Sequence, residues 1–211
     1  MKTDQLIELL AQDSSPTRSF RLILNAAVAC GIVIAAAVFF TRIGFRPDIS
    51  EAVQSSRFVF KFVVTITLAV SATVTAHRLG RPGETLGLKG LMLAAAPALI
   101  MVAALVELFI VPEDRWIPRL IGHNSEVCLT LIPFLSVGPL ACLLIALRQG
   151  APSNPGVAGA VAGLSASGIA ATFYAANCTD DSPLFVITWY SIAILIVTAL
   201  GYLLGRKLLK W

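Results

Sequence analysis

Two cysteines offer the clearest chemistry in this chain of 211 residues. Cys128 and Cys178 each lie beside polar side chains, at the edge of an apolar stretch. Paired thiols can form a disulfide in an oxidising compartment, bind a soft metal ion or respond to an oxidant. The residues leave three alternatives open: a static disulfide, a metal or oxidant sensor, and two unpaired bystanders. The set that could hold a metal ion is Cys128, Cys178, His123 and Asp180, with Asn124, Glu126 and Asp181 nearby.

Lys61 and Glu107 are ionisable residues inside otherwise apolar stretches. A charge within a membrane usually marks a substrate or proton site. Both residues, however, are expected about one turn below the same membrane surface, where long side chains can reach the interface. No further ionisable residues accompany them near the middle of the membrane. We therefore expect a structural ion pair between Lys61 and Glu107 in preference to a translocation site.

These residues must be positioned by membrane-spanning helices, because the composition excludes an ordinary soluble domain. Hydrophobic residues make up 57% of the chain and charged residues 13%, against roughly 25% charged in typical globular domains. The mean hydropathy is +0.83. The sixteen basic residues are scattered between apolar runs, so we expect no nucleic-acid partner. Cys30 and Cys142 lie among apolar neighbours and are expected to be buried filler.

Six stretches are long and apolar enough to cross a membrane, which needs about 20 residues at 1.5 Å each. We expect an all-α, integral membrane bundle of six helices, in which residues 22–211 form the transmembrane domain and residues 1–21 a short lead. The expected spans are Leu22–Phe40, Phe58–Ala76, Leu91–Val111, Val127–Leu147, Val157–Ala176 and Leu184–Leu204.

The distribution of Lys and Arg predicts the orientation. The lead, the second and fourth connections and the C-terminal tail hold ten basic residues, whereas the opposite connections hold five. The positive-inside rule therefore places both termini in the cytoplasm.

The lead is predicted to form a short amphipathic helix over Thr3–Asp13. Its apolar stripe consists of Leu6, Ile7, Leu9 and Leu10, and Asp4 and Glu8 lie on the other face. A helix of about ten residues is unstable alone in water, so it must pack on the membrane, on the bundle or on a partner.

Small residues recur at four-residue spacing on the fifth and sixth spans. Gly159, Gly163 and Ser167 share one face of the fifth span, and Gly201 and Gly205 repeat the spacing on the sixth. Such faces allow two helices to approach closely. We favour packing within the bundle over dimerisation. Pro97, Pro133 and Pro139 are expected to kink the third and fourth spans.

The chain shows no Ser-His-Asp set, phosphate-binding loop or paired catalytic carboxylates, so we do not expect an enzyme. Two other classes remain as alternatives. A small membrane transporter should show broken or polar helices near the midplane. A thiol-redox membrane protein would normally carry a Cys-x-x-Cys pair, which is absent.

Several segments resemble one family in order along the chain. They are Cys128-Leu-Thr-Leu-Ile-Pro133, Leu147-Arg-Gln-Gly-Ala-Pro152, Ala158-Gly-Ala-Val-Ala-Gly163, Tyr174-Ala-Ala-Asn-Cys178, Asp181-Ser-Pro-Leu-Phe185, Trp189-Tyr190 and Gly205-Arg-Lys-Leu-Leu-Lys-Trp211. The opening Met1-Lys-Thr-Asp-Gln-Leu-Ile7 fits as well. By these residues the chain resembles the membrane regulators called negative regulator of sigma F.

The resemblance implies a multi-pass anti-sigma factor of the bacterial inner membrane. Such a protein would hold an extracytoplasmic-function sigma factor until an envelope signal, metal or oxidative stress, reaches two outward-facing cysteines. By position these are Cys128 and Cys178, and the sigma contact is the Thr3–Asp13 segment. No cofactor is expected, and a heavy-metal ion is the candidate signal. The expected partners are the sigma factor and membrane lipid, and a homo-oligomer remains open.

Overall fold

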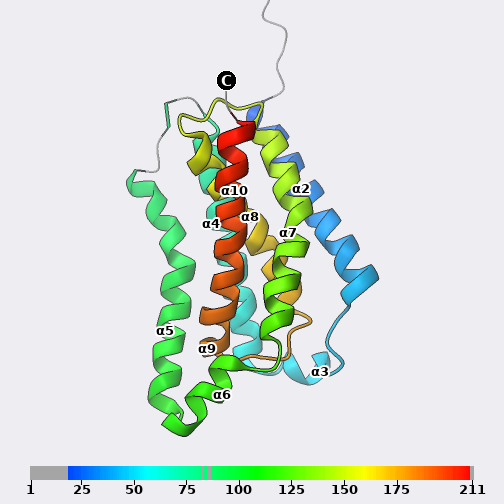
Figure 1. Cartoon of the computed structure of the whole chain (residues 1–211), viewed down its shortest axis with the longest axis vertical. Helices are drawn as coiled ribbons and strands as arrows, with labels where there is room; N and C mark the ends of the chain where they lie inside the picture. The colour runs from blue at the N-terminus through cyan, green and yellow to red at the C-terminus, as the bar shows by residue number, and fades with distance from the viewer. Residues whose placement is uncertain (1–18, 82, 85–86, 210–211) are drawn as a thin grey trace, which may run out of the picture.

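The computed structural model describes residues 19–81, 83–84 and 87–209, and these residues form helices with no strand among them. The described residues include six long apolar helices, and the long helices run up and down the molecule (Figure 1). Those that cross the membrane are α2 (Phe20–Val38, continued by a π-helical turn over Phe39–Ile43), α4 (Ser56–Leu79), α5 (Ala95–Ile110, preceded by a 3₁₀ segment over Leu88–Ala94), α7 (Ser125–Leu147), α8 (Pro155–Ala175) and α10 (Ser191–Leu208, preceded by α9, Pro183–Phe185, and a π-helical turn over Val186–Tyr190).

The six expected spans are confirmed, each within a few residues of its expected bounds. All six are long and apolar enough to cross a membrane. Two short helices, α3 (Ile49–Ala52) and α6 (Trp116–Ile121, after a 3₁₀ turn over Glu113–Arg115), lie in connections. This is the architecture of a multi-pass membrane protein.

The bundle has two ends that differ in their connections. At one end α2 begins and α10 ends, and the connections near residues 80–90 and 148–154 lie at the same end (Figure 1). We call this the terminal end. The opposite end carries the connections over residues 44–55, 111–124 and 176–182. The predicted sigma-binding residues Leu6, Ile7, Leu9 and Leu10 lie outside the described residues.

Helix α8 is the centre of the bundle, because its small residues let neighbours approach on several sides. It is the most buried of the six spans. A Cβ added to Gly159 would collide with the carbonyl oxygen of Gly201 on α10, and one added to Gly163 would lie 2.7 Å from that of Val197. On another side, Gly168 packs against the backbone of Ala69 on α4. Packing of the glycine faces within the bundle is therefore confirmed.

Proline and polar caps set the starts of the last helices. Pro155 and Pro183 occupy first positions of α8 and α9, where a missing N–H costs nothing. The Asn154 side chain accepts a hydrogen bond from the Val157 N–H at 3.1 Å. Pro133 and Pro139 lie inside α7, as expected, whereas Pro97 lies in the first turn of α5, directly after the 3₁₀ segment.

Candidate functional site

One loop, residues 176–182 between α8 and α9, holds most of the polar contacts at the opposite end. It is contacted by the segment before α3, by α4, by α5 and by the link between α6 and α7. The loop carries Cys178 and is the place where these separate parts of the chain meet.

Asp181 in this loop pairs with two cations. Its carboxylate lies 2.9 Å from Nη1 of Arg46 and 2.6 Å from Nζ of Lys61. Both cations also donate to the carbonyl oxygen of Cys178, at 3.2 and 3.0 Å. They lie over the ring of Phe58, 5.6 and 5.3 Å from its centroid. Because the Lys61 side chain is only 1% exposed, its charge depends on these partners.

Arg46 is held in turn by Asp48. The two side chains form paired hydrogen bonds of 2.7 Å each. The hydrogen bonds from Arg46 hold the pKa of Asp48 below its ordinary value. The same pairing with Asp48, followed by Asp181, raises the pKa of Arg46 further above its ordinary value. Both groups are therefore charged at any physiological pH.

Glu107 organises a second polar cluster beside the first. It is 3% exposed and lies 2.5 Å from Arg119 on α6 and 3.4 Å from Arg57 on α4. It also accepts a hydrogen bond from the hydroxyl of Ser182 at 2.8 Å and one from the N–H of Leu184 at 3.3 Å. Glu107 thus ties α5 to the start of α9 and to α6.

The direct Lys61–Glu107 pair expected from the sequence is not formed in the structure. Both residues lie near the opposite end, as predicted, but their side chains are buried and do not reach the interface. Lys61 pairs instead with Asp181, and Glu107 with Arg119 and Arg57. The reason is that the connections fold back onto the bundle and bring their own charges to the buried groups. Depth along a helix cannot reveal such partners.

Asp180 fixes the link between α6 and α7. Its carboxylate accepts hydrogen bonds from the backbone N–H groups of His123 and Asn124, at 3.0 and 2.8 Å. Gly122 makes this approach possible, because its φ is +60° and an added Cβ would lie 2.5 Å from the Phe185 ring. The Asp180 side chain therefore acts as a capping group for the chain entering α7.

The two thiols lie beneath this polar layer. Cys128 and Cys178 are 0% and 1% exposed, belong to one buried cluster with Tyr174 and Tyr190, and are both free. Burial raises the pKa of the Cys178 thiol, and the nearby charge of Lys61 opposes this rise. Among the described residues, the Tyr190 hydroxyl has no hydrogen-bond partner. The structure thus brings the predicted sensor cysteines into one cluster, but shields them from solvent.

The predicted metal set is only partly brought together. The imidazole of His123 lies 3.7 Å from the carboxylate of Asp180, but its side chain is 95% exposed whereas both thiols are buried. In the part of the chain that the structure describes, no three His, Cys, Asp or Glu side chains form a group suited to a metal ion.

Five side chains of this network were not identified from the sequence: Arg46, Asp48, Arg57, Arg119 and Ser182. The three arginines were counted only as indicators of orientation. A sequence signal did exist, since each arginine lies in or beside an opposite-end connection that could reach the expected depth of Lys61 or Glu107.

The fold and this site define a compact, multi-pass membrane protein whose opposite end is bound together by buried ion pairs over two thiols. Such a molecule has connections too short to hold a separate soluble domain among the described residues. Comparison with known proteins gives the family: the chain belongs to the family described as negative regulator of sigma F, whose model matches residues 10–211.

Two relatives are similar over the full length of both chains. The chain is 32% identical over 217 residues to the anti-sigma-F factor NrsF of Caulobacter vibrioides (strain NA1000 / CB15N). It is 31% identical over 222 residues to the probable anti-sigma-F factor NrsF of Azospira oryzae. No solved structure matches the chain.

Proposed function

We propose that this protein is a membrane anti-sigma factor, which holds an extracytoplasmic-function sigma factor inactive at the bacterial inner membrane. The observation that carries the proposal is the full-length similarity to two relatives named as anti-sigma-F factors. The similarity covers all six spans and both ends of the bundle, and is not limited to one apolar helix that unrelated membrane proteins could share.

The charge distribution supports a cytoplasmic terminal end. The segments at this end, with both termini, hold ten basic and four acidic residues, whereas the opposite end holds six basic and eight acidic ones. Basic residues favour the cytoplasmic side of a membrane. The N-terminal lead then lies where a sigma factor is found, and the thiol site faces the envelope.

The sigma contact is proposed for the apolar stripe Leu6, Ile7, Leu9 and Leu10. A short amphipathic helix becomes stable when its apolar face enters a groove on a partner. The lead precedes α2 in the chain, and we propose that a movement of α2 releases the bound segment.

Release is proposed to begin at Cys128 and Cys178, on oxidation or metal binding during envelope stress. The supporting observation is that both thiols lie in one buried cluster under the 176–182 loop. This loop also holds Lys61 on α4 through Asp181 and Glu107 on α5 through Ser182. A chemical change at Cys178 would therefore alter contacts of several helices at once.

The sigma contact can be tested by co-purification from solubilised membranes. Leu6→Glu with Leu10→Glu should release the sigma factor and raise transcription of its target genes, while the protein still inserts. The matched control is Asp4→Asn with Glu8→Gln, which changes the other face of the same helix. Equal sigma retention by the Leu6/Leu10 variant and the parent would contradict the assignment.

The release step can be tested with single Cys→Ser variants at positions 128 and 178. Sigma-dependent transcription should no longer respond to added metal or oxidant in either variant. Cys30→Ser and Cys142→Ser serve as controls, since these cysteines lie on α2 and α7 away from the 176–182 loop. A parental response in both test variants would exclude the thiols as the sensor.

A further inference from the structure

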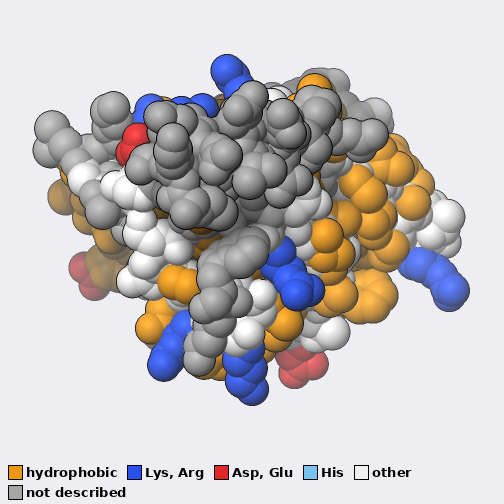
Figure 2. All heavy atoms as spheres, turned by 90° about the horizontal axis from the view of Figure 1, so that it is seen from above, with side chains coloured by type: hydrophobic (Ala, Val, Ile, Leu, Met, Phe, Trp, Pro, Cys, Tyr) orange, Lys and Arg blue, Asp and Glu red, His pale blue; other side chains and the backbone are white. Residues whose placement is uncertain are grey.

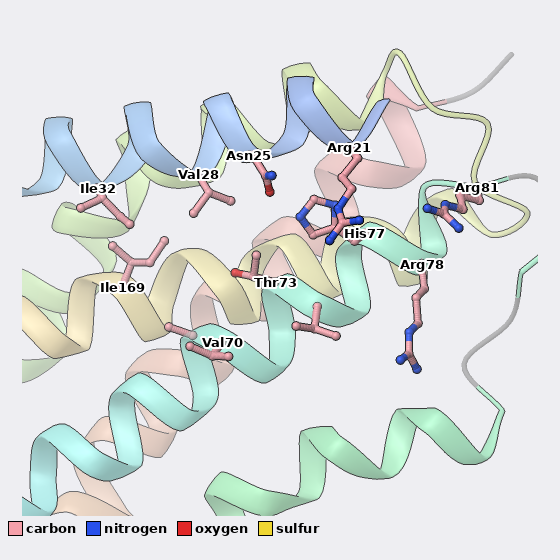
Figure 3. Close-up of a pocket in the computed structure, with 12 residues that line it drawn as sticks. Arg21, Asn25, Val28, Ile32, Val70, Thr73, His77, Arg78, Arg81 and Ile169 are labelled. Atoms are coloured by element: carbon pink, nitrogen blue, oxygen red, sulfur yellow. The ribbon is translucent and has the colours of Figure 1, made fainter. Parts of the chain in front are cut away.

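A groove at the terminal end, between α2 and α4, is not explained by the proposed function. It encloses about 540 Å³ and is lined by both helices, with Ile169 of α8 at its floor (Figure 3). This volume is within the range of ligand-binding sites, roughly 300–1,000 Å³.

The groove exists because α2 packs on α7 instead of on α4. A Cβ added to Gly31 of α2 would lie 2.8 Å from the backbone of Pro139, and one added to Gly138 of α7 would lie 2.5 Å from the Ile34 side chain. These close contacts hold α2 against α7 and apart from α4, and α8 lies at the floor of the space between α2 and α4 (Figure 3).

The mouth of the groove is cationic. Arg21 comes from the first turn of α2, His77 from the last turn of α4 and Arg81 from the residues just after it. The two arginines supply the positive charge, and His77 adds an imidazole N–H donor to the same lining. Arg21 and His77 approach each other at the mouth, whereas the Arg78 side chain points away from Arg21 (Figure 3).

The start of α2, and with it Arg21, is held in place by packing. The ring of Phe20 lies directly against Gly80, where an added Cβ would collide with it, and 2.9 Å from where a Cβ on Gly150 would be. The N–H of Ala151 donates to the carbonyl oxygen of Gly80 at 3.2 Å, which joins the two connections under that ring. The cationic mouth is therefore part of the folded bundle.

Below the mouth the lining changes from polar to apolar. Asn25 and Thr73 face the groove one turn deeper than Arg21 and His77. Val28, Ile32 and Val70 line the part below them, and Ile32 and Val70 are 41% and 56% exposed. Such large apolar side chains can be exposed at this depth because the surrounding medium is lipid.

The length of the groove matches one leaflet of a bilayer. Ile32 is eleven residues beyond Arg21 on α2, which is about 16 Å at 1.5 Å per residue. Half of a hydrocarbon core about 30 Å thick is nearly the same distance. A ligand in the groove would thus run from the head-group level to the middle of the membrane.

We propose that this groove is a binding site for one anionic phospholipid of the leaflet at the terminal end. Its phosphate contacts Arg21, His77 and Arg81, its ester region meets Asn25 and Thr73, and an acyl chain lies along Val28, Ile32 and Val70. Basic pockets between transmembrane helices bind anionic head groups in this manner.

Charge and depth both favour a lipid over other occupants. The ion pairs formed among the described residues all lie at the opposite end. At the terminal end, Arg21 and Arg81 therefore form no ion pair with a carboxylate of the described residues. Figure 2 looks down on the terminal end and shows Lys and Arg side chains around its rim. A water-soluble protein could reach that rim but not the apolar lower part, and free phosphate would leave this part empty.

The test measures lipid binding to the purified full-length protein by native mass spectrometry. Dioleoyl phosphatidylglycerol should bind at least about tenfold more tightly than dioleoyl phosphatidylcholine. Arg21→Gln with Arg81→Gln should remove this preference, since each arginine near a membrane surface is worth about fivefold in binding and the two together about 25-fold. The matched control, Arg206→Gln with Lys207→Gln in the last turn of α10, should keep the parental preference.

A second variant tests the apolar part independently. Val28→Trp with Val70→Trp fills the lower groove and leaves the cationic mouth intact, so it should also lose the tightly bound lipid. Helical content and gel-filtration profiles establish that each variant is folded. Because two separate variants are used, misfolding of one leaves the other as a test.

Three results would overturn the proposal. One is equal binding of the two lipids by the parent. Another is displacement of phosphatidylglycerol by millimolar inorganic phosphate, which would assign the mouth to a free anion. The third is loss of sigma-factor co-purification in the Arg21/Arg81 variant with lipid preference unchanged, which would assign the mouth to a protein partner.

Discussion

At the scale of single residues, Asp181 is the carboxylate that neutralises two cations at the opposite end. It is the carboxylate partner of Lys61, which is 1% exposed, and it also contacts Arg46. Asp181→Asn would leave the Lys61 ammonium buried with only carbonyl oxygens as partners. Removing one member of a buried ion pair costs about 3–5 kcal/mol. We expect a loss of about 3 kcal/mol in unfolding free energy, measured by denaturant titration in mixed micelles.

The matched control for that change is Asp48→Asn. Asp48 also pairs with Arg46, at 2.7 Å, but its side chain is 47% exposed. Solvent screens exposed pairs, so this variant should be much closer to the parent in stability. Similar losses for both variants would mean that burial of Lys61 is not what makes Asp181 important.

Cys178 should react slowly with alkylating reagents while the protein is folded. Burial raises its pKa, so the thiol stays protonated at pH values where an ordinary cysteine, with a pKa of about 8.5, is half ionised. The sign for stability follows: the unfolded chain loses this proton first, so stability falls as pH rises above about 8.5. In a chain that keeps Cys178 alone, the alkylation rate in micelles should still be rising at pH 9–10. After denaturation it should level off near the ordinary pKa, and identical pH profiles would contradict this expectation.

The residue scale is also where sequence reasoning had the least reach. Cysteine positions and the apolar pattern were enough to place Cys128 and Cys178 at the same end of the bundle, and Lys61 and Glu107 at a matching depth near that end. The partners could not be deduced, because Asp181 is 120 positions from Lys61 and lies in a loop whose path depends on tertiary packing. Glu107 and Arg119 are only twelve positions apart, but a helical turn and α6 must reverse the chain before they meet.

At the scale of elements, the glycine faces of α8 and α10 set how closely these helices approach. Gly159→Leu would drive a side chain into the backbone of Gly201 and Gly205, where even a Cβ collides. Because backbone atoms cannot move aside as a flexible side chain can, we expect loss of the folded bundle, seen as a lower melting temperature and aggregation in micelles. Leu164→Ala on the same helix, at a half-buried position, is the control and should cost less. Full retention of stability by Gly159→Leu would show that the α8–α10 contact is looser than described.

Spans were predictable because their length and composition are imposed by the membrane. Each expected span overlaps one observed helix, for example Val127–Leu147 against Ser125–Leu147. The differences occur at the ends, where Pro155 and Pro183 begin helices slightly earlier than the apolar pattern suggested. The central place of α8 follows from its small residues. The separation of α2 from α4 had no counterpart in the sequence pattern, since it results from the fit of Gly31 and Gly138 to particular neighbours on α7 and α2.

At the scale of the whole molecule, the two ends differ in how their charges are used. All ion pairs among the described residues lie at the opposite end, where acidic residues outnumber basic ones. The terminal end has an excess of basic residues arranged around its rim (Figure 2). One end is therefore internally neutralised, whereas the other presents positive charge to its surroundings. An excess of Lys and Arg at one end is the pattern that the positive-inside rule associates with the cytoplasmic side.

Orientation can be measured with a membrane-impermeant maleimide on intact cells, in a variant without native cysteines. Gln54→Cys places an exposed thiol at the opposite end, and Ala151→Cys places one at the terminal end. We expect labelling of position 54 in cells with a permeabilised outer membrane, and of position 151 only after the inner membrane is broken.

The charge imbalance should also control the orientation. Adding Lys residues to the connection at positions 53–55, while replacing Arg78 and Arg81 with Gln, should produce a population of molecules labelled at position 151 from outside. Suppose instead that position 151 is labelled in cells with an intact inner membrane when no charged residue has been changed. The N-terminal lead would then lie away from any sigma factor, and the proposed function would fail.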